Sequence, residues 1–242
     1  MMRRLILTIS LLFAALSGFA QNVKLYTTQD GLAGSLLKNI FVDSSSMVWV
    51  SSETGLNRYD GSNFVKYFHN PSDSRSLANN FVNSVFQDSR GNIFVCTHSG
   101  VQLYDPYTDS FSPLATIGPE QKPSGQISRI AESADGELWA AGNSVFRLEL
   151  DGNRISLSEL PQCEDIRFAD YAAFDGYGNF WCVRFRQGVY RLDTDGVVHR
   201  YFADGGVSIT DMCTDPSGNI YLASVNLGLL RYRSGSDDFE RV

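Results

Sequence analysis

A short pattern recurs five times along the chain and strongly limits what the chain can fold into. Each copy places an aromatic residue just after a turn-forming cluster, as in Asp88-Ser-Arg-Gly-Asn-Ile-Phe94 and Asp215-Pro-Ser-Gly-Asn-Ile-Tyr221. The five aromatic residues lie 45, 45, 42 and 40 residues apart, and they are Trp49, Phe94, Trp139, Trp181 and Tyr221. A period of this length is the signature of a repeat architecture built from small, similar units.

Within each unit the residue pattern predicts four short strands. An apolar strand leads into the turn, an aromatic strand such as 47–51 follows, and strands such as 56–60 and 64–68 complete the unit. Turn clusters between β-branched and aromatic runs indicate antiparallel hairpins. The fold class is therefore all-β, a β-propeller of four-stranded antiparallel blades. About five blades are predicted, at residues 36–68, 80–113, 125–156, 165–202 and 205–242.

Residues 23–28 lie before the first blade and resemble the outer strand 64–68 in pattern. Propellers commonly close by giving such an N-terminal strand to their last blade. The predicted blades already have their own fourth strands, so 23–28 is left as a spare outer closing strand. We therefore expect an incomplete ring, whose open edges full closure would remove. The alternative is a closed five-bladed ring, in which 23–28 displaces 239–242.

The first twenty residues have the pattern of a secretory signal peptide. Arg3 and Arg4 precede an apolar run, and the small residues Gly18 and Ala20 suit the cleavage positions. The run is shorter than the roughly 20 residues that a bilayer span needs. We expect residues 1–20 to be removed and 21–242 to be exported as the propeller segment. The alternative is an uncleaved N-terminal anchor.

Several stretches carry one recognisable motif. They are Leu25-Tyr-Thr-Thr-Gln-Asp-Gly-Leu32, Asn39-Ile-Phe-Val-Asp43, Val48-Trp-Val-Ser-Ser52, Thr54-Gly-Leu-Asn-Arg-Tyr-Asp-Gly61 and Gly100-Val-Gln-Leu-Tyr-Asp105. They closely resemble the two-component regulator propeller repeat, which is found in periplasmic sensors of hybrid two-component systems. The later units depart from the motif, and Ser144 stands where a Gly is expected.

This resemblance implies a periplasmic sensor whose parent protein is anchored in the inner membrane. Relatives of this kind carry two seven-bladed propellers, a membrane helix and a histidine kinase, so the five blades would belong to a seven-bladed ring. The implied ligand is an oligosaccharide. The implied partners are further blades and the membrane-bound kinase region of a longer chain, and the resemblance also allows a homodimer through the parent sensor. The sequence contains no kinase region, so this chain is predicted not to be an enzyme.

The sequence offers no motif for catalysis or for metal binding. Its three histidines are scattered, and no HExxH, GxSxG or P-loop pattern occurs. The four cysteines have neither CxxC spacing nor the density of a disulfide framework, so buried free thiols are expected. We therefore expect no catalytic residues, no metal and no cofactor. A formal net charge of −7, without runs of Lys or Arg, also disfavours nucleic acid as a partner.

A ligand is expected at the mouth of the ring, where loops leading into the first strands meet loops between the second and third strands. The predicted ligand-binding residues are Lys38, Glu53, Asn83, His98, Arg129, Tyr171, Arg186 and Asn226. This polar set, with several cations, suits sugar hydroxyls or a carboxylate. Two other functions stay open: a propeller lyase or hydrolase acting on an extracytoplasmic substrate, and a scaffold propeller that binds protein.

Overall fold

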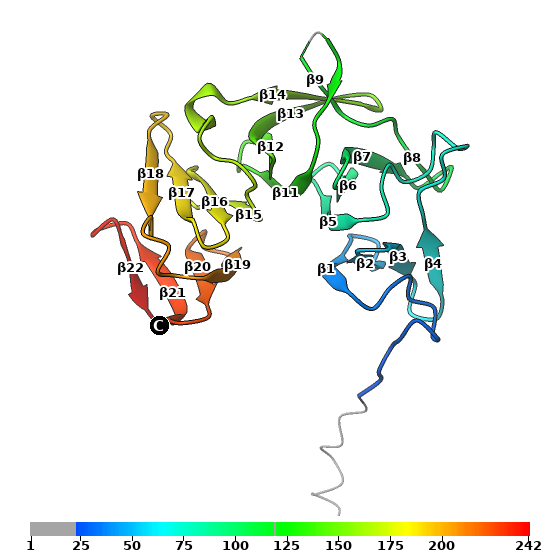
Figure 1. Ribbon diagram of the computed structural model, residues 1–242, viewed down its shortest axis with the longest axis horizontal. Coiled ribbons are helices and arrows are strands. Elements are labelled where there is room, and N and C mark those ends of the chain that lie inside the picture. The colour runs from blue at the N-terminus through cyan, green and yellow to red at the C-terminus, as the bar shows by residue number, and fades with distance from the viewer. Residues whose placement is uncertain (1–22, 119) are drawn as a thin grey trace, which may run out of the picture.

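The computed structural model describes residues 23–118 and 120–242, and the predicted signal peptide lies outside them. The described chain consists of strands and turns, with a short 3-10 helix at Pro161–Cys163. The strands form five sheets that follow one another along the chain. Figure 1 shows the sheets side by side in an open arc. The all-β fold with propeller blades is therefore confirmed.

Each sheet is one blade, and its first strand lies on the inner side of the arc (Figure 1). Blade 1 comprises β1 (Leu37–Val42), β2 (Val48–Ser52), β3 (Gly55–Tyr59) and β4 (Phe64–Tyr67). Blade 2 comprises β5 (Val82–Gln87), β6 (Ile93–Thr97), β7 (Gly100–Asp105) and β8 (Ser110–Phe111). Blade 4 comprises β15 (Tyr171–Phe174), β16 (Phe180–Arg184), β17 (Gly188–Leu192) and β18 (Val198–Tyr201). Blade 5 comprises β19 (Ile209–Thr214), β20 (Ile220–Ser224), β21 (Gly228–Arg233) and β22 (Asp238–Arg241).

Blade 3 departs from the four-stranded pattern because a hairpin extends it. Its own strands are β11 (Ile127–Glu132), β12 (Leu138–Gly142), β13 (Val145–Asp151) and β14 (Arg154–Glu159). The hairpin of β9 (Thr116–Ile117) and β10 (Lys122–Pro123) precedes them in the chain. Strand β9 pairs in parallel with β14, which makes a six-stranded sheet. The connection between blades 2 and 3 thus covers an edge that would otherwise stay open.

Residues 23–28 form no strand in this structure. The hydroxyls of Tyr26 and Tyr59 are hydrogen-bonded at 2.7 Å, and the Tyr26 ring packs edge-on against Phe64. All five blades already have their own outer strands, so 23–28 finds no free blade edge here, and its closing role stays a prediction. Strand β22 keeps its place beside β21, and the arc is open. The alternative of a closed five-bladed ring is therefore not what the structure shows.

The apolar core lies between neighbouring blades, because one small sheet cannot bury both of its faces alone. Trp49 of blade 1 packs edge-on against Tyr104 of blade 2, with ring centroids 4.9 Å apart. Trp181 of blade 4 packs in the same way on Tyr232 of blade 5, at 4.6 Å. Trp49 and Trp181 are 1% and 0% exposed, which identifies them as core residues rather than ligand-stacking residues.

The aspartate that opens the turn in four of the five blades explains why the sequence repeat has a fixed spacing, and Ser133 takes its place in blade 3. Oδ1 of Asp43 accepts the backbone N–H of Met47 at 2.9 Å, and Oδ2 accepts Nε1–H of Trp49 at 2.8 Å. Asp175 accepts the Nε1–H of Trp181 at the same distance. One carboxylate therefore fixes both the turn and the orientation of the core indole.

The cysteines are free thiols, and Cys96, Cys163 and Cys182 are buried as expected. Burial raises the pKa of the Cys96 thiol to about 12. The expectation of burial is wrong for Cys213, which is exposed. Its neighbour Met212 faces blade 4, so Cys213 lies on the opposite face of blade 5, which no described blade covers.

Candidate functional site

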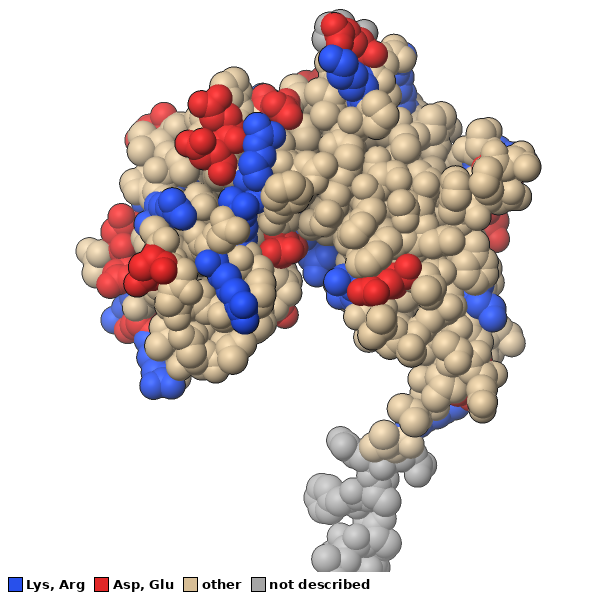
Figure 2. Space-filling view, viewed as in Figure 1, with Lys and Arg blue, Asp and Glu red and all other residues tan. Residues whose placement is uncertain are grey.

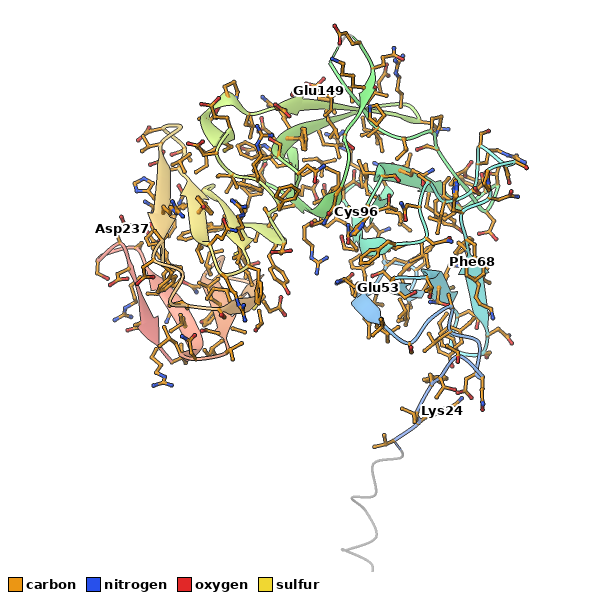
Figure 3. The ribbon with its side chains drawn as sticks, viewed as in Figure 1. Lys24, Glu53, Phe68, Cys96, Glu149 and Asp237 are labelled. Carbon is orange, nitrogen blue, oxygen red and sulfur yellow. The ribbon has the colours of Figure 1, made fainter. Side chains whose placement is uncertain are left out.

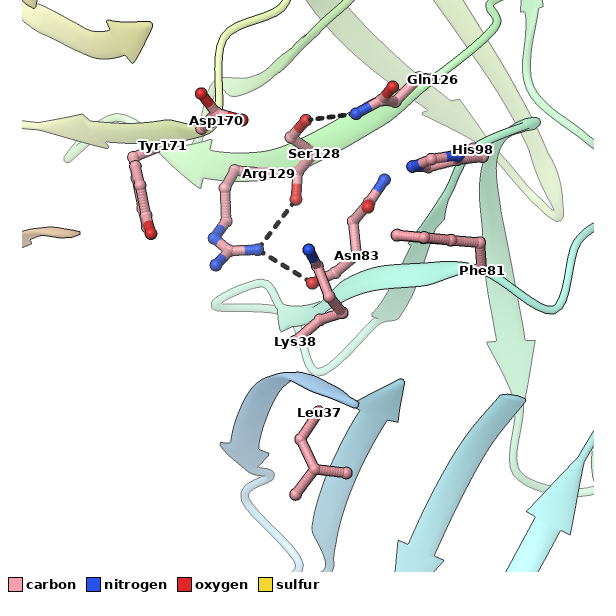
Figure 4. Close-up of a pocket in the computed structure, with 10 residues that line it drawn as sticks. All are labelled: Leu37, Lys38, Phe81, Asn83, His98, Gln126, Ser128, Arg129, Asp170 and Tyr171. Carbon is pink, nitrogen blue, oxygen red and sulfur yellow. Dashed lines mark hydrogen bonds between the residues drawn. The ribbon is translucent and has the colours of Figure 1, made fainter. Parts of the chain in front are cut away.

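The inner side of the arc holds a cavity of about 200 Å³ between blades 1 to 4. Strands β1, β5, β11 and β15 contribute most of its lining, together with the loops beside them (Figure 4). The lining residues are Leu37, Lys38, Phe81, Asn83, His98, Gln126, Ser128, Arg129, Asp170 and Tyr171. The structure therefore brings together five of the eight residues predicted from the sequence, which are Lys38, Asn83, His98, Arg129 and Tyr171.

Irregular pairing at the start of the inner strands positions several of these side chains. The register of β1 shifts between Leu37 and Asn39, and β5, β11 and β19 shift at the equivalent place. A bulge of this kind adds one residue to a strand and redirects its side chains. The extra residue is Lys38 in blade 1 and Asn83 in blade 2. The shift thus places one polar residue at the same point of the inner surface in blades 1, 2, 3 and 5, whereas β15 of blade 4 pairs without a shift.

Arg129 lies at the centre of the cavity wall. Its Nη1 donates hydrogen bonds to the backbone carbonyls of Asn83 and Ser128, both at 3.1 Å. The guanidinium carbon lies 5.3 Å from the centroid of the Tyr171 ring, which allows a cation–π contact. A guanidinium has five N–H donors, so donors remain for a ligand.

A second group of side chains forms a stacked aromatic surface. The rings of Phe81 and His98 are nearly parallel at 19°, with centroids 3.7 Å apart, and Nζ of Lys38 lies 5.3 Å from the Phe81 centroid. Partial burial lowers the pKa of His98, the charge of Lys38 lowers it further, and Glu53 opposes them. The imidazole is therefore neutral near pH 7, where it can both donate and accept a hydrogen bond.

Two of the predicted residues also hold the blades together. The Asn83 side chain is buried, and its Nδ2 donates to the carbonyl of Ile127 at 2.7 Å. The Tyr171 hydroxyl donates to the carbonyl of Thr210 in blade 5. Burial raises the pKa of Tyr171, so the hydroxyl stays protonated and keeps this bond at neutral pH. The Nδ2 donor of Asn83 and the hydroxyl of Tyr171 are thus already partnered, and the ring of Tyr171 remains for a ligand.

The other three predicted residues lie outside the cavity lining. Glu53 is half-buried on the loop between β2 and β3, close enough to influence His98 (Figure 3). Arg186 is exposed, and its guanidinium lies over the ring of its neighbour Phe185 at 5.2 Å. The Asn226 side chain donates to the carbonyl of Gly206 at 2.6 Å, which closes a loop of blade 5.

The sequence analysis missed five lining residues, which are Leu37, Phe81, Gln126, Ser128 and Asp170. Phe81 and Gln126 lie two residues before the bulged positions of blades 2 and 3, and alignment of the units on their turns gave no reason to select them. Asp170 precedes Tyr171, and its Oδ2 accepts the backbone N–H of Phe185 at 3.0 Å.

Figure 2 shows basic and acidic side chains close together along this inner side of the arc. Among residues 23–118 and 120–242, no cluster of His, Cys, Asp or Glu has a geometry that could hold a metal ion.

The blades and their arrangement make this chain a β-propeller protein. The family model described as the two component regulator propeller matches residues 76–99, in blade 2. The predicted resemblance to the two-component regulator propeller repeat is thereby confirmed. In the described part of the chain, no helix is long and apolar enough to cross a membrane.

Comparison with known proteins agrees with this class. Histidine kinase P4 of Formosa agariphila is 40% identical over 70 residues, which are 27% of this chain and 5% of that protein. The extracellular domain of a putative hybrid two component system from B. thetaiotaomicron superposes with a TM-score of 0.74 at 21% identity, over 90% of this chain and 31% of that one. A virginiamycin B lyase from Staphylococcus aureus gives a TM-score of 0.65 at 14% identity, over 92% and 74%. The chain thus spans about a third or less of the two-component proteins it matches, and the structural likenesses establish the propeller fold.

Proposed function

We propose that this chain is the ligand-sensing propeller segment of a periplasmic two-component regulator. It recognises an oligosaccharide on the inner side of the arc and passes the signal to a histidine kinase region outside this chain. The observation that carries the proposal is the convergence of Lys38, His98, Arg129 and Tyr171 from four blades on one cavity. The confirmed repeat family supports the assignment to a regulator.

The chemistry of the cavity suits a sugar. Binding sites for small molecules combine apolar or aromatic surface with a few well-placed polar groups. Here the stacked rings of Phe81 and His98 supply flat surface, and Arg129 and Lys38 supply donors. A volume of about 200 Å³ lies below the roughly 300–1,000 Å³ of pockets that enclose drug-sized ligands. The cavity therefore holds one unit of the oligosaccharide, and the remaining units extend along the inner surface.

The position of the site also suits signalling. Ligand contacts would come from neighbouring blades, so binding favours one arrangement of the blades over others. A ligand shifts a conformational equilibrium only when its affinity differs between two states. A site shared by several blades meets this condition, because a change in blade spacing changes the ligand contacts.

Calorimetric titration of the purified chain with a panel of oligosaccharides tests the proposal. We expect oligosaccharides of one structural class to bind. Tyr171→Leu should weaken that binding about tenfold or more, because an aromatic stacking surface is lost. Tyr107→Leu is the matched control, because Tyr107 is 97% exposed on an outer turn. Thermal unfolding of each variant checks that the blades stay folded, and His98→Ala provides a second variant at an exposed position.

Failure of every oligosaccharide to bind would contradict the proposed function. Chemical turnover of a bound compound, lost in His98→Ala, would instead support the lyase or hydrolase alternative. Binding that Tyr171→Leu and His98→Ala both leave unchanged would place the ligand elsewhere and refute the site.

A further inference from the structure

We propose that the unit held in the cavity carries an anionic group, a carboxylate or a sulfate ester, and that Lys38 and Arg129 bind it. This inference rests on the proposed function, because it names the chemical class of the ligand at the same site. Both side chains line the cavity. Figure 4 shows the Lys38 ammonium and the Arg129 guanidinium pointing into the same space.

Two like charges that converge in a concave site repel each other. At the effective dielectric constant of a protein surface this repulsion is stronger than in water, which screens the same charges when they are free to separate. Neither Lys38 nor Arg129 forms an ion pair with a carboxylate of residues 23–118 or 120–242. An anion between them would turn this repulsion into attraction.

Among the lining residues, the two cations Lys38 and Arg129 outnumber the carboxylates. Asp170 is the one carboxylate among the lining residues, and its Oδ2 already accepts the backbone N–H of Phe185. Glu53 and Asp211 lie outside the lining, close enough to influence His98 and Tyr171 respectively. The lining therefore keeps a positive excess in a chain whose net charge is −7. Such a local positive field in an acidic protein selects an anionic ligand.

Contacts within the protein restrain the Arg129 guanidinium in a position where it can bind an oxyanion. Nη1 is fixed by two backbone carbonyls, and the Tyr171 ring lies along the guanidinium. The planar fork of N–H donors matches the paired oxygens of a carboxylate or a sulfate. Because these protein contacts exist without ligand, little side-chain entropy remains to be lost on binding. Lys38 adds a second, more mobile point charge from blade 1.

Two pairs of ligands, matched except for charge, test the inference by calorimetry. One pair is an oligogalacturonate and its fully methyl-esterified form, and the other is a sulfated galactose oligosaccharide and its desulfated form. We expect the charged member of one pair to bind about tenfold or more tightly than its neutral partner, since each charge-assisted hydrogen bond contributes strongly. The pair that responds identifies whether the anion is a carboxylate or a sulfate ester.

Variants of the two cations complete the test. Lys38→Met and Arg129→Gln should each reduce the affinity for the charged ligand toward that of its neutral partner, and Arg129→Lys should retain part of it. Lys66→Met is the matched control, because Lys66 is exposed on β4 at the outer side of blade 1. Raising the salt concentration from about 0.05 to 0.5 M should weaken binding of the charged ligand more than that of the neutral one.

The outcomes separate this inference from the proposed function. Equal affinity for the charged and neutral members of both pairs would overturn the anionic inference and leave oligosaccharide sensing standing. Unchanged affinity in both Lys38→Met and Arg129→Gln would overturn it too. If neither these ligands nor any other oligosaccharide binds, the proposed function and the inference both fail.

Discussion

Asp109, in the turn between β7 and β8, accepts a hydrogen bond from Arg58 of the preceding blade, with Nη1 3.1 Å from Oδ1. The same carboxylate oxygen accepts the hydroxyls of Tyr67 and Tyr104, each at 2.6 Å. Arg58 and Tyr67 belong to blade 1, and Asp109 and Tyr104 belong to blade 2. One carboxylate therefore connects the outer strands of two blades above the buried Trp49.

The same arrangement recurs between blades 4 and 5. Oδ1 of Asp237 lies 3.2 Å from Nη2 of Arg191 and accepts the hydroxyls of Tyr201 and Tyr232 at 2.6 Å. Figure 3 shows Asp237 at the outer rim of the arc. Asp109 and Asp237 both have positive φ, at 51° and 50°. We call each of these four-residue sets a rim clasp: Arg58, Tyr67, Tyr104 and Asp109, and Arg191, Tyr201, Tyr232 and Asp237.

Loss of a rim clasp should loosen the joint between two blades. We expect Asp109→Ala to lower the free energy of unfolding by about 1–2 kcal/mol, because three donors lose their acceptor while half of the Asp109 side chain is already in water. Urea denaturation measures the change. Asp135→Ala is the control, since Asp135 is exposed and no hydrogen bond to its side chain is found in the described chain. Equal stability of the two variants would show that the clasp contributes nothing.

The rim clasps also predict a loss of stability in acid. Burial alone would raise the pKa of Asp109, but hydrogen bonds from Tyr104 and Tyr67 and the charge of Arg58 lower it below its ordinary value near 3.9. The pKa of Asp237 is lowered in the same way by Tyr201, Tyr232 and Arg191, also against burial.

A carboxyl with a lower pKa in the folded state stabilises the fold above its unfolded pKa, and this is lost as the pH falls through its folded pKa. We therefore expect the free energy of unfolding to decrease from about pH 5 downward. The double variant Asp109→Asn, Asp237→Asn should show a smaller decrease over the same range. Parallel pH profiles for the two proteins would refute the role of these carboxylates.

Close backbone contact between blades 4 and 5 makes Gly218 sensitive to substitution. A Cβ at Gly218 would lie 2.3 Å from Cα of Gly176, whose N–H donates to the Gly218 carbonyl at 2.9 Å. We expect Gly218→Ala to cost about 1–3 kcal/mol for overpacking, in addition to about 1 kcal/mol for its positive φ.

Gly196→Ala separates these two contributions. Gly196 has a similar φ of +83°, and a Cβ there would meet no atom within 4 Å. Its substitution should therefore cost about 1 kcal/mol, from backbone strain alone. Thermal unfolding of both variants measures the difference. If Gly196→Ala is as damaging as Gly218→Ala, the contact between blades is not the cause.

The charges around the cavity can be measured through His98. Burial and Lys38 hold its pKa below the ordinary value near 6.5, and Glu53 acts in the opposite direction. We expect Lys38→Met to raise the pKa of His98 and Glu53→Gln to lower it further. An NMR titration resolves the shifts, because the chain has three histidines. A pKa of His98 that does not respond to Lys38→Met would show that the two groups are not close in solution.

Much of the fold was predictable because its units are local. The spacing of Asp43 and Trp49, and of Asp175 and Trp181, reflects a hydrogen bond within one turn and strand, so the sequence shows it directly. The rim clasps could not be predicted in this way. Each joins residues of two units that are tens of positions apart, and alignment of units hides contacts between them. The added hairpin of blade 3 lies in a connection that the repeat does not cover.

The cavity was partly predictable for the same reason. Lys38, Asn83 and Arg129 occupy nearly equivalent positions in successive units, so alignment places them on one inner surface. Arg186 and Asn226 also follow the alignment, yet neither lines the cavity. Their side chains are engaged locally, with Phe185 and with the carbonyl of Gly206. Local contacts of this kind depend on loop conformation, which a repeat alignment does not determine.

A crystal structure of the chain with a bound oligosaccharide tests the account most directly. We predict that one sugar unit lies in the cavity, in contact with Arg129 and Lys38 and stacked near Tyr171 or Phe81. An oligosaccharide bound at the outer rim, or on an outer face of blade 1 or blade 5, with the cavity free of sugar, would contradict the account.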